Sequence, residues 1–220
     1  MAQQSGGDKV TRNLVIGMVV FVLLIGVVFS IISNNKGKGP IPSSVSKTNG
    51  FGIVFNKDLK DKPVVDLWED FQCPICARFE ETNGKFIQQL ITEKRATVIF
   101  HTLSFIGPES ILAANAGACA ADEGKFLQLH AYLYANQGTE NTGVWSNQAL
   151  ILAGAGAGIT STKFAECISA GTYTSWVDDV AKDGTDKGIN STPTVFVNGK
   201  ELDRNTQYFD AAAFQAAIEG

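Results

Sequence analysis

The stretch DFQCPICARFE, which runs from Asp70 to Glu80, decides the fold of this 220-residue chain. The run VVDLW just before it is β-branched and aromatic, which is typical of a strand. After Cys73, apolar residues recur at helical spacing as far as Ile91, so a helix of about five turns is expected there. The two cysteines of the stretch therefore lie where a strand passes into a helix.

This position determines what the two sulfur atoms can do. At a helix start, unpaired amide N–H groups and the positive end of the helix dipole favour thiolate over thiol. Cys73 is therefore the candidate nucleophile, and Pro74 suits a first helical turn that needs no N–H donor. Cys76 lies one turn further on, close enough to close a disulfide and to resolve a mixed disulfide formed by Cys73.

Two other interpretations of the cysteine pair are weaker. A structural zinc site normally has four ligands, but the remaining cysteines, Cys119 and Cys167, are solitary and far apart in the sequence. An inert structural disulfide gains little stability from closing a loop of two residues. The pattern thus favours a redox couple and no metal.

Strands and helices alternate in the rest of the chain after residue 50. Five short β-branched or aromatic runs are expected to be strands: residues 51–55, 64–68, 96–100, 192–197 and 200–202. Between about residue 107 and residue 188 the chain is rich in alanine and helical in pattern, and a last helix closes it. A mixed α/β sheet with a helical insertion is expected.

The segment at residues 14–33, LVIGMVVFVLLIGVVFSIIS, carries no charge and is long enough to cross a bilayer as a helix. A buried core helix would not be apolar on every face, and a cleaved signal peptide would be shorter and end in small residues. One uncleaved transmembrane helix is therefore predicted. Residues 34–50 are rich in Gly, Pro and Ser and are expected to be a flexible linker to a folded domain at residues 51–220.

The distribution of charged residues bears on two questions, which are whether the chain binds nucleic acid and how the apolar segment is oriented in the membrane. The formal net charge is -4, with 18 basic and 22 acidic residues mixed along the chain, which gives no basic face for nucleic acid. The basic residues on the two sides of the apolar segment balance, so they do not orient it. Residues 1–13 are predicted to be a cytoplasmic tail, because a short tail is easily retained and the cysteines need an oxidising compartment outside. This makes the chain a single-pass protein of the cell membrane.

Three segments, VVDLWEDFQCPICARFE, KFLQLHAYLYANQ and GINSTPTVFVNGK, together resemble the membrane-tethered, DsbA-like branch of the thioredoxin superfamily. They occur in the same order and at similar spacing. The resemblance implies a thioredoxin-like fold and transfer of a Cys73–Cys76 disulfide to reduced exported proteins, with no cofactor besides that disulfide. A membrane partner of the quinone-coupled type is expected to reoxidise the pair.

The same resemblance gives a role to the loop at Thr192-Pro193. From the residues alone it would be an ordinary turn with a trans bond, because cis is the minority state of X-Pro bonds. The resemblance implies that Pro193 is cis and faces the redox pair. It also implies that the backbone of Thr192 pairs with the substrate chain.

Two positions depart from the pattern of this family. Relatives often carry a buried acid six residues before the first cysteine, where this chain has Leu67. Asp66, Glu69 and Asp70 are the candidates for handling protons instead, and the sequence does not choose among them. Ile75 stands where the best-known strong oxidants have histidine, which leaves the oxidising strength of the pair open.

The other two cysteines lie in the helical block, 48 positions apart. Outside the cell an even total of four cysteines favours a Cys119–Cys167 disulfide, with two buried free cysteines as the alternative. His130 shares a helical face with aromatic residues, which favours a histidine of the core, and His101 ends a strand.

Two further functions remain compatible with the sequence. An extracytoplasmic reductase or isomerase would need the Cys73–Cys76 pair kept reduced, so the redox state of the pair in the cell discriminates it from an oxidant. A non-catalytic binding module with a thioredoxin fold would keep its function after both cysteines are replaced by serine.

Overall fold

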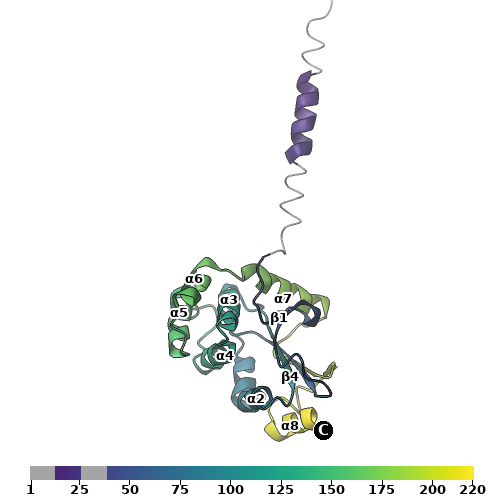
Figure 1. Ribbon diagram of the computed structural model, residues 1–220, viewed down its shortest axis with the longest axis vertical. Coiled ribbons are helices and arrows are strands. Elements are labelled where there is room, and N and C mark those ends of the chain that lie inside the picture. The colour runs from purple at the N-terminus through teal and green to yellow at the C-terminus, as the bar shows by residue number, and fades with distance from the viewer. Residues whose placement is uncertain (1–12, 26–38) are drawn as a thin grey trace, which may run out of the picture. The chain divides into compact units, whose positions relative to one another are not determined.

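The computed structural model describes residues 13–25 and 39–220, which belong to two separate units. Residues 13–25 form a helix, drawn in purple in Figure 1. No helix within these described ranges is both long and apolar enough to cross a bilayer. The span predicted at residues 14–33 overlaps the helix at 13–25. Its remainder, and residues 1–12 of the tail predicted at residues 1–13, lie outside the described residues.

A six-stranded sheet organises residues 39–220, in the order β1-β2-β4-β3-β5-β6. The strands are β1 Val45–Ser46, β2 Gly52–Phe55, β3 Val64–Glu69, β4 Thr97–Thr102, β5 Thr194–Val197 and β6 Lys200–Glu201. The central pair, β3 and β4, is parallel, and each of the other pairs is antiparallel. Because a parallel pair needs a crossover, a helix between β3 and β4 is required, and α2 supplies it.

Seven helices accompany the sheet in this part of the chain. They are α2 Pro74–Thr92, α3 Pro108–Asp122, α4 Phe126–Ala135, α5 Asn147–Gly156, α6 Thr162–Ala170, α7 Thr174–Asp186 and α8 Ala211–Glu219. Figure 1 shows α3, α4, α5 and α6 gathered on one side of the sheet, while α2 packs with α8. The predicted α/β arrangement with a helical insertion is confirmed, since α3 to α7 fill the interval expected at residues 107–188.

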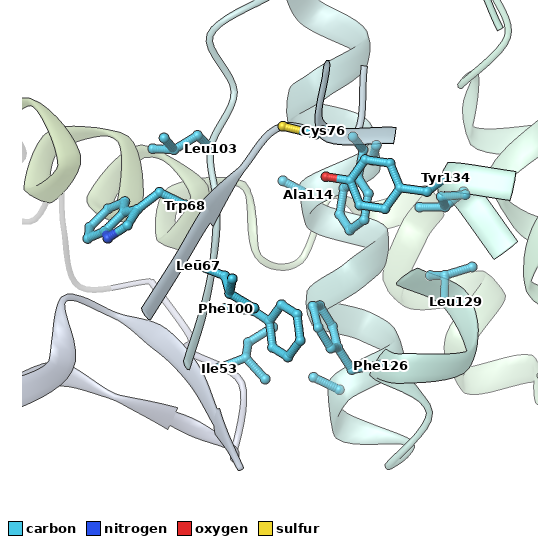
Figure 2. Close-up of a cluster of buried hydrophobic side chains, with 14 of the residues drawn as sticks. Ile53, Leu67, Trp68, Cys76, Phe100, Leu103, Ala114, Phe126, Leu129 and Tyr134 are labelled. Carbon is cyan, nitrogen blue, oxygen red and sulfur yellow. The ribbon is translucent and has the colours of Figure 1, made fainter. Parts of the chain in front are cut away.

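The core forms between the strands and the helices α2 and α4. The apolar face predicted for α2 is buried, and its apolar members are Phe79, Phe86, Ile87, Leu90 and Ile91. Figure 2 shows side chains from three strands meeting two from α4, and these are Ile53, Leu67, Phe100, Phe126 and Leu129. This packing fixes the start of α2 against the end of β3, where the two cysteines lie.

The linker predicted at residues 34–50 differs from the structure in its second half. Val45 pairs with Ile53 to make β1 an edge strand, and a 3₁₀ turn, η1 Lys47–Asn49, follows it. The backbone N–H of Ser43 donates to Asp122 at 2.9 Å. A strand of two residues has no periodicity of its own, so composition alone reads it as linker, and the tertiary partner β2 orders it.

Candidate active site

Cys73 caps the start of α2, and Cys76 lies one turn inside it. The backbone of Cys73 is extended, with φ -73° and ψ 115°, and its N–H donates to the carbonyl of Asp70 at 2.9 Å. Pro74 is the first helical residue, as its lack of an N–H allows. Both cysteines are free thiols, with 7% of Cys73 and 0% of Cys76 exposed. The first sulfur is the more accessible of the two.

The two thiols have opposite acidities. The hydrogen bond from the Cys76 thiol lowers the pKa of Cys73 to about 6, against the effect of burial, and backbone N–H groups at the helix start add to the lowering. Burial first, and then the hydrogen bond to Cys73, raises the pKa of Cys76 well above its ordinary value. At neutral pH the pair therefore consists of a Cys73 thiolate and a Cys76 thiol.

A loop with a cis peptide bond faces Cys73. The Thr192–Pro193 bond is cis, and the carbonyl oxygen of Thr192 lies 3.5 Å from the Cys73 sulfur. The loop leads directly into β5, which pairs with β3, so the sheet holds it opposite the start of α2. The Thr194 hydroxyl donates to the Ser191 carbonyl at 2.7 Å and closes the turn. The structure thus brings together the four residues Cys73, Cys76, Thr192 and Pro193.

A glutamine from the helical insertion holds the loop before Cys73. The side chain amide of Gln137 donates to the carbonyls of Phe71 at 2.8 Å and Cys73 at 3.1 Å. It is the last residue of the segment KFLQLHAYLYANQ, which resembles relatives, but the sequence assigns no role to it. The insertion therefore braces the cysteine loop through Gln137.

The three candidate carboxylates go to different places because side chains alternate along a strand. Asp66 lies on the face of β3 that also carries Trp68, and its carboxylate is 3.3 Å from His101. The ring of His101 stacks on Trp68 with centroids 3.7 Å apart. Asp66 and His101 therefore belong to the face of the sheet away from α2 and α4.

Asp70 is fully buried and organises the loop between β3 and α2. Its carboxylate accepts hydrogen bonds from the Gln72 N–H at 2.9 Å, the Ser110 hydroxyl at 2.7 Å and the Ile106 N–H at 3.1 Å. Burial raises the pKa of Asp70, while these donors lower it. Its bonds tie three backbone segments together, which is the work of a structural residue.

Glu69 is the candidate that faces the thiols. It lies on the core face of β3, where its carboxylate is 3.1 Å from Nε2 of His130, and His130 Nδ1 is 3.8 Å from Glu80. Burial raises the pKa of Glu69 to about 8, and the Cys73 charge adds to the rise. Its own charge in turn helps to raise the pKa of Cys76. The sequence alone did not indicate that Glu80 and His130 would join Glu69, because they come from two other elements.

Cys119 and Cys167 form a disulfide that joins α3 to α6 within the insertion. Their Cα atoms are 5.9 Å apart, and Cys119 is 1% exposed. Buried alanines surround Cys119 along α3. This pair belongs to the packing of the insertion.

Two large apolar side chains near the cysteines are exposed. Ile75, between the two cysteines, is 49% exposed, and Phe105 is 42% exposed. Phe105 precedes Ile106, whose N–H binds Asp70, so its loop lies against the CPIC loop. Ile75 thus presents an exposed apolar side chain between the two cysteines, and Phe105 presents one on a loop that is hydrogen-bonded to Asp70 through Ile106.

Comparison with known proteins adds the family context. A thioredoxin family model matches residues 58–219. The Na(+)/H(+) antiporter NhaA 1 of Mycobacterium sp. (strain KMS) is 31% identical over 164 residues, 72% of this chain and 25% of that protein. This chain thus spans about a quarter of the length of such antiporters. The probable disulfide bond formation protein D of Bacillus anthracis is 26% identical over 152 residues, 68% of this chain and 67% of that protein.

A solved structure gives the same result in three dimensions. The reduced form of the disulfide bond oxidoreductase DsbG from Mycobacterium tuberculosis superimposes with a TM-score of 0.66 at 28% identity. The match covers 78% of this chain and 87% of that one.

Proposed function

This chain belongs to the thioredoxin family, and we propose that it is a thiol:disulfide oxidoreductase that introduces disulfide bonds into exported proteins. One observation carries the proposal. The Cys73 sulfur, whose pKa the Cys76 hydrogen bond lowers to about 6, lies 3.5 Å from the Thr192 carbonyl at a cis-proline loop. A nucleophilic sulfur beside a backbone carbonyl at the edge of a loop suits exchange with an extended polypeptide.

The first step opens the Cys73–Cys76 disulfide of the oxidised protein. A substrate thiolate attacks the Cys73 sulfur, a mixed disulfide forms, and the electron pair of the broken S–S bond goes to Cys76. Cys76 then takes a proton, since burial raises its pKa well above the ordinary value. In the second step another substrate thiolate attacks the substrate sulfur of the mixed disulfide, and Cys73 leaves as a thiolate.

The low pKa of Cys73 makes the second step favourable, because a thiol of low pKa is the better leaving group. The substrate ends with a disulfide, and the protein ends with the Cys73 thiolate and the Cys76 thiol. Two electrons move between sulfur atoms, so the exchange itself uses no cofactor. Glu69 is the carboxyl group that supplies the proton to Cys76, because it is the candidate carboxylate on the core face of β3.

Unfolded exported proteins fit the surface around Cys73. The exposed apolar side chains of Ile75 and Phe105 offer contact to side chains that a folded protein would bury. The carbonyl of Thr192 offers a main-chain acceptor to an extended segment. Both features favour reduced, unfolded polypeptides as substrates over small thiols.

Residues 14–33 anchor the protein in the cell membrane in this proposal, with residues 1–13 in the cytoplasm and the redox domain outside. The uncharged apolar run of 20 residues supports the anchor. A quinone-coupled membrane partner reoxidises the Cys73–Cys76 pair after each turnover. A membrane anchor beside such a partner would hold the Cys73–Cys76 pair and the redox site of the partner near the same membrane surface.

The test is a Cys76→Ser variant expressed in its native membrane. Without Cys76 the mixed disulfide cannot be reversed from within the protein, so adducts of Cys73 with exported proteins should accumulate in the membrane fraction. A Cys73→Ser variant is the matched control and should trap nothing. A stable Cys76→Ser protein without adducts would contradict the proposal, and a wild-type pair held reduced in the cell would identify a reductase or isomerase.

A further inference from the structure

Three buried ionisable side chains from three different elements meet behind the cysteines. Glu69 comes from β3, Glu80 from α2 and His130 from α4, and their candidate ligand or proton-binding atoms all lie within 4.8 Å of one another. Only 4% of the Glu69 side chain, 9% of the Glu80 side chain and 3% of the His130 side chain are exposed. We call these three residues the buried triad.

The buried triad must hold a proton at neutral pH. Among the described residues, neither carboxylate forms an ion pair with lysine or arginine, and the Oε1 atoms of Glu69 and Glu80 have no hydrogen-bond partner. Two adjacent buried carboxylates without a cation repel each other and are costly to ionise together. Burial raises the pKa of each to about 8, in keeping with that expectation. Burial also lowers the pKa of His130, which favours the neutral ring.

The triad reaches from the cysteines to the surface. At its inner end the charge of Glu69 acts on Cys76. At its outer end Glu80 lines a groove between α2 and α4, together with Gly84 and Tyr134. Figure 2 shows Tyr134 near Cys76, and its hydroxyl is buried without a partner.

We propose that Glu80 and His130 extend the proton-handling site of Glu69 into a relay that carries protons between Cys76 and the groove between α2 and α4. This inference rests on the proposed function of the Cys73–Cys76 pair. Glu69 alone is enclosed in the core, so a proton it gives up has to be replaced through a neighbour. Glu80 is the member of the triad that also lines the groove.

The proton balance of the relay follows the opening of the disulfide. When the Cys73–Cys76 bond breaks, Cys76 becomes a thiolate and takes the proton of the Glu69 carboxylic acid. Glu69 is then a carboxylate and receives the proton of Glu80, held in reach by the contacts of His130 with both. Water in the groove returns a proton to Glu80. Reoxidation of the pair runs the same transfers backward.

Other titratable or charged groups face the relay from each element around it. Those next to the triad or lining the groove are Cys73, Cys76, Arg78, Glu81, Lys85 and Tyr134. Arg78, Glu81 and Lys85 are exposed on α2, where solvent screens their charges. They set the charge of the groove but do not touch His130.

The test compares Glu80→Gln with Glu81→Gln, which makes the same substitution of a carboxyl group by an amide on the same helix and groove without touching the triad. The readout is the rate at which dithiothreitol opens the oxidised pair, normalised to the thiolate concentration and measured from pH 5 to pH 10. The wild type should show an inflection near pH 8, where the triad carboxyls titrate. In Glu80→Gln the rate at pH 7 should fall about tenfold, less than the effect of removing a direct proton donor. Glu81→Gln should behave like the wild type.

A second variant tests the same geometry without removing an ionisable group. A Cβ at Gly84 would lie 2.5 Å from Oε2 of Glu80, so Gly84→Ala must displace that flexible carboxylate from the triad. It should reproduce the rate loss of Glu80→Gln, although alanine favours the helix. Unchanged profiles in both variants, with an active wild type, would overturn the relay and leave the proposed function intact. If the wild type itself oxidises no dithiol, the proposed function fails first.

Two further measurements test whether the buried triad holds a proton or a bound cation. Infrared titration of the protonated carboxyl band should show wild-type carboxyl groups titrating near pH 8, and part of this signal should be missing from Glu80→Gln. Metal analysis of the purified protein should find no stoichiometric divalent cation. A bound cation would take the place of the shared proton and would overturn the relay.

Discussion

The two cysteine pairs of this protein have the same chemical groups but lie in different environments. Cys73 and Cys76 are free thiols at a helix start, beside a buried carboxyl group and a cis-proline loop. Cys119 and Cys167 form a disulfide between two helices of the insertion, among alanines. The difference teaches that the environment decides the chemistry of a cysteine pair. Helix-start N–H groups and a neighbouring thiol make one sulfur acidic, while close packing of α3 against α6 gives the other pair a structural place.

The largest expected effect is complete loss of thiol oxidation in Cys73→Ser. Serine removes the nucleophile, yet it is a good residue for a helix start, where Cys73 makes no side-chain cap, so stability should not fall. The measurement is oxidation of a reduced model protein. The Cys119→Ala, Cys167→Ala double variant, assayed at a temperature where it is folded, should retain most activity. Equal losses in the two variants would remove the distinction between the pairs.

A smaller effect is expected on stability from the same double variant in the insertion. Loss of a disulfide that closes a loop of 48 positions should lower the free energy of unfolding by about 3–4 kcal/mol on the chain-entropy model. Urea unfolding of the protein with its Cys119–Cys167 disulfide intact, and of the double variant, measures it. Replacing Cys73 and Cys76 by alanine should cause no comparable drop relative to the protein in which only this pair is reduced, since no bond closes a loop there.

The smallest expected effect is the pH dependence of cysteine alkylation, which should differ between Cys73 and Cys76. Because the Cys76 hydrogen bond lowers the pKa of Cys73 to about 6, its alkylation rate should rise roughly tenfold between pH 5 and pH 7 and then level off. Mass spectrometry of peptides labelled with iodoacetamide measures it. Cys76 should remain unlabelled over this range, because burial raises its pKa and limits access.

The lowered pKa of Cys73 also has a consequence for folding, with a definite sign. Between about pH 6 and the ordinary thiol pKa of about 9, the unfolded chain binds a proton at Cys73 that the folded protein does not. The contribution of this group to stability therefore rises as pH rises through that window and is lost as pH falls through 6. Comparing the reduced protein with Cys73→Ser isolates this contribution from those of Glu69 and Glu80, which have the opposite sign.

Much of the fold followed from local pattern. The apolar spacing after Cys73 predicted α2 with its buried face, and the β-branched runs predicted the strands other than β1. β1 was missed because two paired residues carry no periodic signal, and its order comes from pairing with β2. In the candidate site, the CPIC spacing identified the thiols, while nothing in the sequence around Gln137 predicts its hydrogen bonds to the cysteine loop.

The sequence does not indicate which of the three candidate carboxylates lies beside the thiols. Asp66, Glu69 and Asp70 are close together in sequence, and each carries a carboxyl group. The sequence alone therefore does not indicate which of them handles protons. Alternation along β3 puts Glu69 and Asp66 on opposite faces, and only the packing of α2 and α4 tells which face adjoins the thiols. The carboxylate of Asp70 accepts hydrogen bonds from backbone N–H groups of the loop.

The sequence by itself determined the CPIC cysteine pair, its place at a helix start and the order of the strands other than β1, because these depend on spacing between near neighbours. The tertiary structure alone decided that Glu69, Glu80 and His130 meet. These residues are up to 61 positions apart, and they come together only when β3, α2 and α4 pack into one core. Burial there then sets their protonation, since the low polarity of the core penalises charge in a way that no linear pattern records.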